Sequence, residues 1–131
     1  MIVVDTSAFL EALIGRPPPE PLQARLLATS LHAPHVVDLE FLQALRRLSD
    51  GGGLARSDAE QAREHFAALP IVRYTHTILA DRIWGLRHNL TPYAAAYVAL
   101  SEALDAPLIT ADARMARAAG HRARVEVFAS S

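Results

Sequence analysis

Residues 1–15, MIVVDTSAFLEALIG, contain the pattern that decides the fold. A short apolar run rich in β-branched residues ends at Asp5, which is typical of a buried strand. The segment from Thr6 to Gly15 then predicts a short helix that the glycine closes. A buried strand that leads directly into a helix indicates the alternation of an α/β protein.

The same alternation continues along the rest of the chain. Further strands are predicted at residues 33–37, 70–74, 106–110 and 124–128. Helices are predicted at residues 21–31, 38–50, 57–69, 75–90, 91–104 and 113–120. We therefore expect an α/β fold in which one domain, residues 1–131, has a central parallel sheet flanked by helices.

Two of these helices have recognisable sequence signals. In the helix at 38–50, leucines at positions 39, 42, 45 and 48 form one apolar stripe, which predicts the buried face. The segment SDAE at 57–60 has the pattern of a capping box, so Ser57 is expected to start the next helix. The glycines at 51–53 lie between the two helices and predict a turn, because the Gly-Lys of a phosphate-binding loop is missing.

Composition excludes several classes of mechanism. The chain has no cysteine, so it forms no disulfide and no thiolate metal site, and this fits a cytoplasmic protein. All 13 basic residues are arginine, which excludes a Walker lysine, a Schiff base and a Ser–Lys dyad. The net charge of −1 gives no bulk attraction for nucleic acid. The sequence has no secretory signal and no apolar run of the roughly 20 residues that span a bilayer, so no membrane association is expected.

Three acids are placed where a parallel sheet binds ligands. Asp5 and Asp112 follow predicted strands, and Glu40 lies in the first turn of the helix after another strand. Carboxylates from separate segments are the ligands that Mg²⁺ or Mn²⁺ prefers. Each acid also has a purely structural interpretation: Asp5 as a helix cap, Asp112 as a favourable charge on a helix capped by Thr110, and Glu40 as an ordinary first-turn residue.

Histidine and serine chemistry is less well supported. The six histidines show no paired metal-binding spacing, so we interpret them as surface or packing residues. Ser7 has no recognisable histidine partner, which argues against a serine hydrolase.

The segment TPYAAAYVALSEAL at 91–104 predicts a helix that Thr91 caps. Its expected core face contains Tyr93, Tyr97, Leu100 and Leu104. Residue 94 would be the third helical residue, where an acid would complete a capping box and interact favourably with the helix dipole. The chain has Ala94 there.

Four segments together resemble one known family. MIVVDTSAFLEAL, HVVDLEFLQALRRL, LRHNLTPYAAAYVALSEAL and APLITADARMARAAG are similar, in order and spacing, to bacterial PIN-domain proteins of the VapC toxin type. The resemblance covers nearly the whole chain and implies a PIN-like three-layer sandwich. It also implies a cytoplasmic endoribonuclease that depends on Mg²⁺, with Mn²⁺ as a substitute, and that cleaves tRNA or rRNA. A VapB-type antitoxin and a second copy of the chain are the implied partners.

The resemblance also implies roles for individual residues. Asp5, Glu40 and Asp112 correspond to the acidic metal-binding centre, and Thr6 and Thr110 to the hydroxyl positions beside it. Arg87 matches a frequent basic position to which we assign no role. Family members usually have an aspartate where this chain has Ala94.

Two explanations of Ala94 are open. The aspartate was removed in the laboratory to silence a toxic protein, which the intact remainder of the motifs favours, or it was lost naturally. The leading hypothesis is a toxin ribonuclease weakened or inactivated by Ala94. The alternatives are a catalytically dead module that binds antitoxin or RNA, and a metal-dependent phosphohydrolase that acts on a small molecule.

Overall fold

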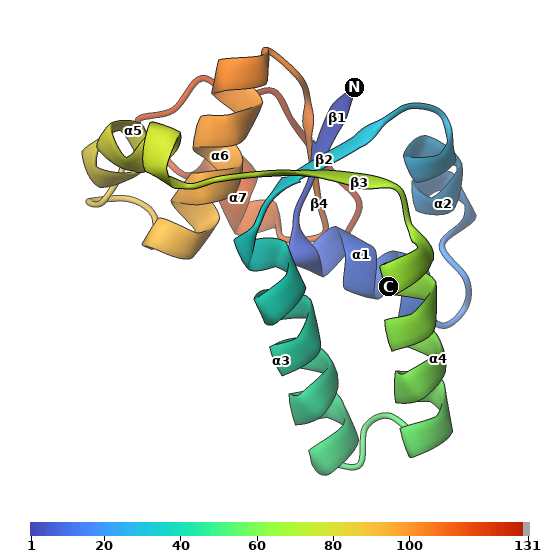
Figure 1. Cartoon of the computed structure of the whole chain (residues 1–131). Helices are drawn as coiled ribbons and strands as arrows, with labels where there is room; N and C mark the ends of the chain where they lie inside the picture. The colour runs from blue at the N-terminus through green and yellow to red at the C-terminus, as the bar shows by residue number, and fades with distance from the viewer. Residues whose placement is uncertain (130–131) are drawn as a thin grey trace.

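The fold of the computed structural model, which describes residues 1–129, is built on one parallel sheet (Figure 1). The strands are β1 (Ile2–Val4), β2 (Leu31–Pro34), β3 (Ile71–Tyr74), β4 (Leu108–Thr110) and β5 (Val125–Val127). They lie in the order β3-β2-β1-β4-β5, and all four neighbouring pairs are parallel. The predicted parallel sheet is confirmed.

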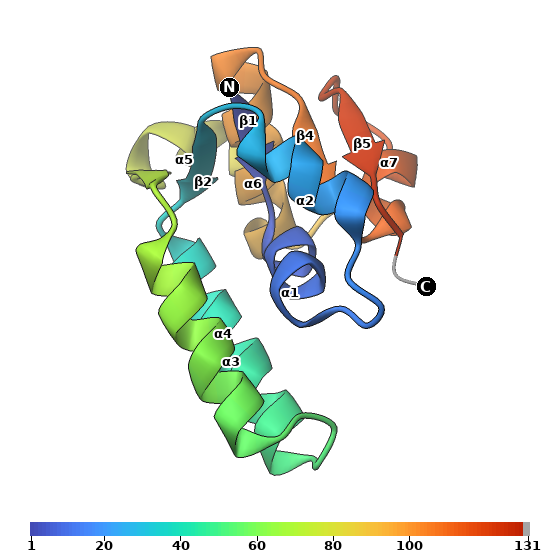
Figure 2. The ribbon, with the colours of Figure 1, turned by 90° about the vertical axis from the view of Figure 1, so that its right-hand side faces the viewer.

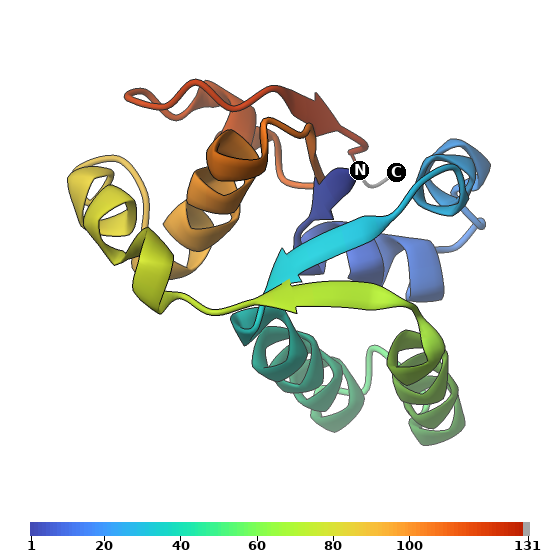
Figure 3. The same ribbon diagram turned by 45° about the horizontal axis from the view of Figure 1, so that its top comes forward.

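Helices cover both faces of the sheet. They are α1 (Thr6–Ile14), α2 (Glu20–Leu27), α3 (Val36–Asp50), α4 (Arg56–Ala68), α5 (Ala80–Gly85), α6 (Pro92–Leu104) and α7 (Ala113–Arg117), with a short 3₁₀ turn at Thr77–Leu79. Figure 3 shows α5 and α6 on one side of the strands, and α1, α3 and α4 on the other. This arrangement is the predicted sandwich of a sheet between helices.

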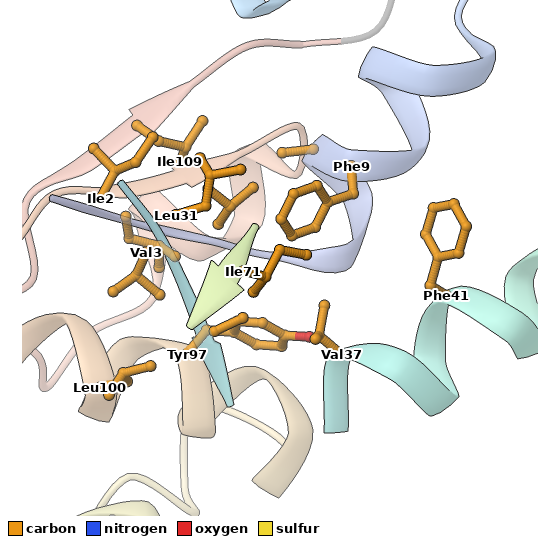
Figure 4. Close-up of a cluster of buried hydrophobic side chains, with 14 of the residues drawn as sticks. Ile2, Val3, Phe9, Leu31, Val37, Phe41, Ile71, Tyr97, Leu100 and Ile109 are labelled. Atoms are coloured by element: carbon orange, nitrogen blue, oxygen red, sulfur yellow. The ribbon is translucent and has the colours of Figure 1, made fainter. Parts of the chain in front are cut away.

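The core lies between β1, β4 and the helices on either face (Figure 4). Val3, Leu108 and Ile109 are fully buried, as expected for central strands of a parallel sheet that is covered on both sides. Leu100 of α6 and Phe9 of α1 are also buried, from opposite faces.

Helices α3 and α4 form a long hairpin that projects from the body of the molecule (Figure 2). Phe41 of α3 stacks on Phe66 of α4, with ring centroids 4.0 Å apart, and Phe66 meets Phe9 of α1 edge to face at 5.3 Å. These three rings attach the base of the hairpin to α1, and so they fix the position of α3 relative to β1.

The second strand lies earlier in the chain than predicted. The prediction was residues 33–37, but β2 spans Leu31–Pro34, and Val36 and Val37 begin α3. Proline lacks the N–H needed to continue a strand that is paired on both sides, so the ladder ends at Pro34. Val37 is buried from the helix instead. The expected helix at 21–31 correspondingly ends at Leu27.

Two helix starts or lengths also differ from the prediction. Helix α4 begins at Arg56, with Ala55 at the N-cap and no side-chain cap, so the predicted capping box is wrong. The predicted helix at 75–90 is instead a 3₁₀ turn followed by α5, which ends at Gly85, a residue of low helix propensity. In contrast, the predicted Thr91 cap of α6 is confirmed, because its hydroxyl accepts a hydrogen bond from the Ala94 N–H at 3.2 Å.

The leucine stripe of α3 is mostly not the buried face. Leu39 is 71% exposed, and Leu42 and Leu48 are also at the surface, while Val37, Phe41 and Leu45 face the core. Residues four apart lie on one helix face as naturally as residues three apart, and the three-ring cluster selects the face that contains Phe41. None of the helices described for residues 1–129 is long and apolar enough to span a bilayer.

Candidate active site

The direction in which strands are added to the sheet reverses between β1 and β4. Strands β2 and β3 follow β1 on one side, whereas β4 and β5 lie on its other side. Such a reversal leaves a crevice at the carboxyl ends of the two strands, and ligands of open α/β sheets bind there. Asp5 follows β1 directly, and Asp112 lies two residues beyond β4. Glu40 reaches the same end from α3, which follows β2.

Asp5 is a buried carboxylate, only 6% exposed, whose oxygens are both hydrogen-bonded. Its Oδ1 accepts from the Ser7 hydroxyl at 2.7 Å and from the Ala8 N–H at 3.0 Å. Its Oδ2 accepts from the Thr110 hydroxyl at 2.5 Å. Burial raises the pKa of Asp5 above its ordinary value, and the three donors oppose that rise. The Ala8 bond also makes Asp5 the N-cap of α1, so its structural interpretation is correct.

Ser7 links β1 to the loop after β4, a role that the sequence did not reveal. Besides donating to Asp5, its oxygen accepts the Ala111 N–H at 2.9 Å and lies 3.1 Å from the Thr110 hydroxyl. Thr110 is fully buried and also accepts the Asp112 N–H at 3.0 Å. The two hydroxyls therefore hold Asp5 and the backbone of Asp112 in a fixed relation.

Glu40 is held by two neutral hydroxyl groups. Its Oε1 accepts from Thr6 at 3.0 Å and from Tyr97 of α6 at 2.6 Å. The Thr6 and Tyr97 oxygens lie 2.9 Å apart, so the three groups form a closed ring of contacts. The sequence predicted Thr6 as a site residue, whereas Tyr97 was predicted only as part of a core stripe.

Asp112 is held by a cation from its own helix. The Arg114 guanidinium contacts both carboxylate oxygens, with Nη2 to Oδ2 at 2.9 Å and Nε to Oδ1 at 3.0 Å. This hydrogen-bonded arginine lowers the pKa of Asp112. Asp112 also caps α7 through the Arg114 N–H at 2.9 Å, so the cap is Asp112 itself and not Thr110.

The three acids line one cleft of about 260 Å³. Thr6 and Ala94 line it as well, whereas Thr110 lies behind Asp5 in the interior. Ala94 is the third residue of α6, so the first turn of that helix faces the acids across the cleft. The structure thus places the predicted acids, Thr6 and Ala94 around one cleft, with Thr110 hydrogen-bonded to Asp5 behind it.

Oxygen ligands from three segments fit a hard cation such as Mg²⁺ or Mn²⁺ in chemical type. Their present arrangement is more open than a ligand shell, because no three Asp, Glu, His or Cys side chains among residues 1–129 lie close enough together to hold a metal ion. Each acid is instead held by partners of its own: hydroxyls contact Asp5 and Glu40, and Arg114 contacts Asp112.

Arg87 does not belong to this cleft. Its guanidinium lies over the Trp84 ring, 4.4 Å from the centroid, in a neighbouring apolar groove of about 370 Å³ between α5 and α6. The two hollows are adjacent, since Tyr93 lines both of them. Tyr93 is 60% exposed, so its predicted place on the core face of α6 is wrong.

Comparison with known proteins agrees with this architecture. Residues 2–121 match the PIN domain. The chain is 45% identical over 117 residues to VapC ribonuclease Mb0985 of Mycobacterium bovis, covering 88% of each chain. Its fold is similar to PAE2754 of Pyrobaculum aerophilum (TM-score 0.71, 18% identity, 96% and 83% of the two chains). It is also similar to a chain of the DNA-bound VapBC structure of Salmonella typhimurium (TM-score 0.70, 15% identity, 96% of each chain). The chain therefore belongs to the PIN-domain family, in which it has VapC ribonuclease homologues.

Proposed function

We propose that this protein is the toxin of a type II toxin–antitoxin system and acts as a metal-dependent endoribonuclease in the cytoplasm. The observation that carries the proposal is the cleft at the strand reversal, which Asp5, Glu40 and Asp112 line in a chain with VapC ribonuclease homologues. RNA is the proposed substrate class, with tRNA or rRNA as its members.

Asp5, Glu40 and Asp112 would hold the cation, Mg²⁺ or Mn²⁺. When bound, such an ion supplies a water of lowered pKa and stabilises the negative charge on a phosphate. Ser7 and Thr110 keep Asp5 oriented toward the cleft, and Thr6 and Tyr97 do the same for Glu40. Arg114 contacts both oxygens of Asp112, so its positive charge would compete with a cation for that carboxylate.

Ala94 supports the further proposal that activity is weak in this form. Its methyl group lines the cleft in the first turn of α6, where an aspartate would add a fourth carboxylate. The same observation favours the second candidate function, a PIN-like module that binds antitoxin or RNA without cleaving it. The two candidates differ in whether the chain cleaves RNA when an aspartate replaces Ala94.

The test compares Ala94→Asp with the unaltered chain in an RNA cleavage assay that contains Mn²⁺ or Mg²⁺. We expect Ala94→Asp to cleave at least tenfold faster, since changes around a metal site commonly alter activity about 10- to 100-fold. Ala103→Asp adds the same charge to an exposed position of α6 and serves as the matched control, with no gain expected. Equal rates for all three proteins would contradict the proposal.

We also propose a homodimer and a VapB-type antitoxin as partners. The similarity in fold to a VapBC chain supports the antitoxin. The cleft supports the way in which it would bind, because Arg114 already contacts both oxygens of Asp112, and an antitoxin arginine could make the same planar contact. Light scattering of the chain alone, and then mixed with a VapB-type antitoxin, tests both. A monomer that binds no such antitoxin would disprove them.

A further inference from the structure

Tyr97 is a core residue with a polar end in the candidate active site. It lies three residues after Ala94 on α6, is 2% exposed, and extends toward the start of α3 (Figure 4). Its hydroxyl is 2.6 Å from Glu40 Oε1 and 2.9 Å from the Thr6 oxygen. Tyr97 therefore connects the helix on one face of the sheet with an acid from the helix hairpin on the other.

The direction of the hydrogen bond follows from the chemistry of the two groups. A phenol, whose ordinary pKa is about 10, keeps its proton at neutral pH. The carboxylate of Glu40 can only accept, and so Tyr97 donates. Thr6 donates to the same oxygen at 3.0 Å. Oε1 is thus fixed by two donors, while Oε2 accepts no hydrogen bond within the described part of the chain.

Neutral donors orient a carboxylate without cancelling its negative charge. Asp112 shows the contrast, because the Arg114 guanidinium that orients it also neutralises its charge. From this difference we infer that Tyr97 is a positioning residue, which with Thr6 holds Glu40 oriented so that its free oxygen can bind the divalent cation. The inference rests on the proposed function and assigns Tyr97 a role in that same site.

The experiment measures Mn²⁺ affinity by electron paramagnetic resonance for the unaltered chain and for Tyr97→Phe. We expect Tyr97→Phe to bind Mn²⁺ about tenfold more weakly, at the lower end of the 10- to 100-fold range for groups that orient metal ligands. Thr6→Val, which removes the other donor, should weaken binding in the same direction. Tyr74→Phe is the matched control, because it also deletes a hydroxyl that is hydrogen-bonded, here to His32 Nδ1 at 2.8 Å, outside the cleft.

The pattern across the variants separates a positioning role from a structural one. Thermal unfolding without metal reports the loss of stability, which should be similar for Tyr97→Phe and Tyr74→Phe, whereas only Tyr97→Phe should lose Mn²⁺ affinity. Equal Mn²⁺ affinity for Tyr97→Phe and the unaltered chain, or an equal loss for both phenylalanine variants, overturns the inference alone. If the unaltered chain binds no Mn²⁺, both the inference and the proposed metal dependence are wrong. Mn²⁺ binding without RNA cleavage by Ala94→Asp disproves only the proposed activity.

Discussion

At the scale of single residues, the three acids of the cleft differ in what holds them. Asp5 and Glu40 are held by hydroxyl and N–H donors that carry no charge. Asp112 is held by Arg114, a surface side chain whose positive charge would compete with a bound cation. The arginine would therefore act against the proposed metal binding, although it orients the carboxylate.

We predict that Arg114→Gln raises Mn²⁺ affinity by a factor of about two to five, which is the modest effect expected of an exposed ion pair. Isothermal titration at low salt measures it, because screening weakens exposed charges at high salt. Arg117→Gln on the same helix removes one charge without a hydrogen bond to Asp112 and should have a smaller effect. Weaker Mn²⁺ binding by Arg114→Gln would mean that the arginine supports the site instead of opposing it.

The acids could be predicted from sequence because Asp5 and Asp112 follow predicted strands and Glu40 lies early in the helix after another, but the partners Ser7 and Tyr97 could not. Ser7 donates to Asp5 and also accepts the N–H of Ala111, more than a hundred residues away. Tyr97 is separated from Glu40 by 57 residues. Their local patterns, a serine in a helix and an aromatic residue on an apolar face, are the same with or without these contacts. Only the folded chain reveals them.

At the scale of elements, local signals located helices and strands well and buried faces less well. Strand β2 lies earlier in the chain than predicted and ends at Pro34, and α4 starts at Arg56 without the predicted capping box at Ser57. On α3, the side that faces the core is set by Phe66 of α4, which stacks on Phe41. Amphipathic spacing alone fits two overlapping faces of such a helix, so contacts from a different helix decide between them.

At the scale of the whole molecule, the alternation of strands and helices predicted a parallel sheet, but not the order of its strands. That order depends on which side of β1 each crossover returns to, and no local pattern encodes this choice. The reversal between β1 and β4 nevertheless explains why Asp5 and Asp112 line the same cleft. Strand-end acids were informative before the order was known, since the carboxyl ends of parallel strands share one edge of the sheet.

The sheet also contains a buried polar network outside the cleft, which makes a prediction about the stability of the whole molecule. His32 of β2 is 5% exposed, with Nδ1 hydrogen-bonded to the Tyr74 hydroxyl at 2.8 Å and Nε2 to the Ser30 hydroxyl at 2.9 Å. Burial, aided by the nearby positive N-terminus, lowers the pKa of His32. The unfolded chain, in which histidine has a pKa of about 6.5, therefore binds a proton more readily than the folded chain.

Stability should accordingly be complete above about pH 6.5 and decline as the pH falls below it, by at most about 1.4 kcal/mol per pH unit for one proton. Asp5 acts in the opposite sense, because its raised pKa lets the folded chain take up a proton first as the pH falls. The informative quantity is therefore the difference between variants. Urea unfolding between pH 7.5 and 5.5 should show a shallower decline for His32→Gln than for the unaltered chain, whatever its absolute stability. His65→Gln, at the surface of α4, should keep the full slope. Identical slopes for His32→Gln and the unaltered chain would show that some other group causes the loss of stability in acid.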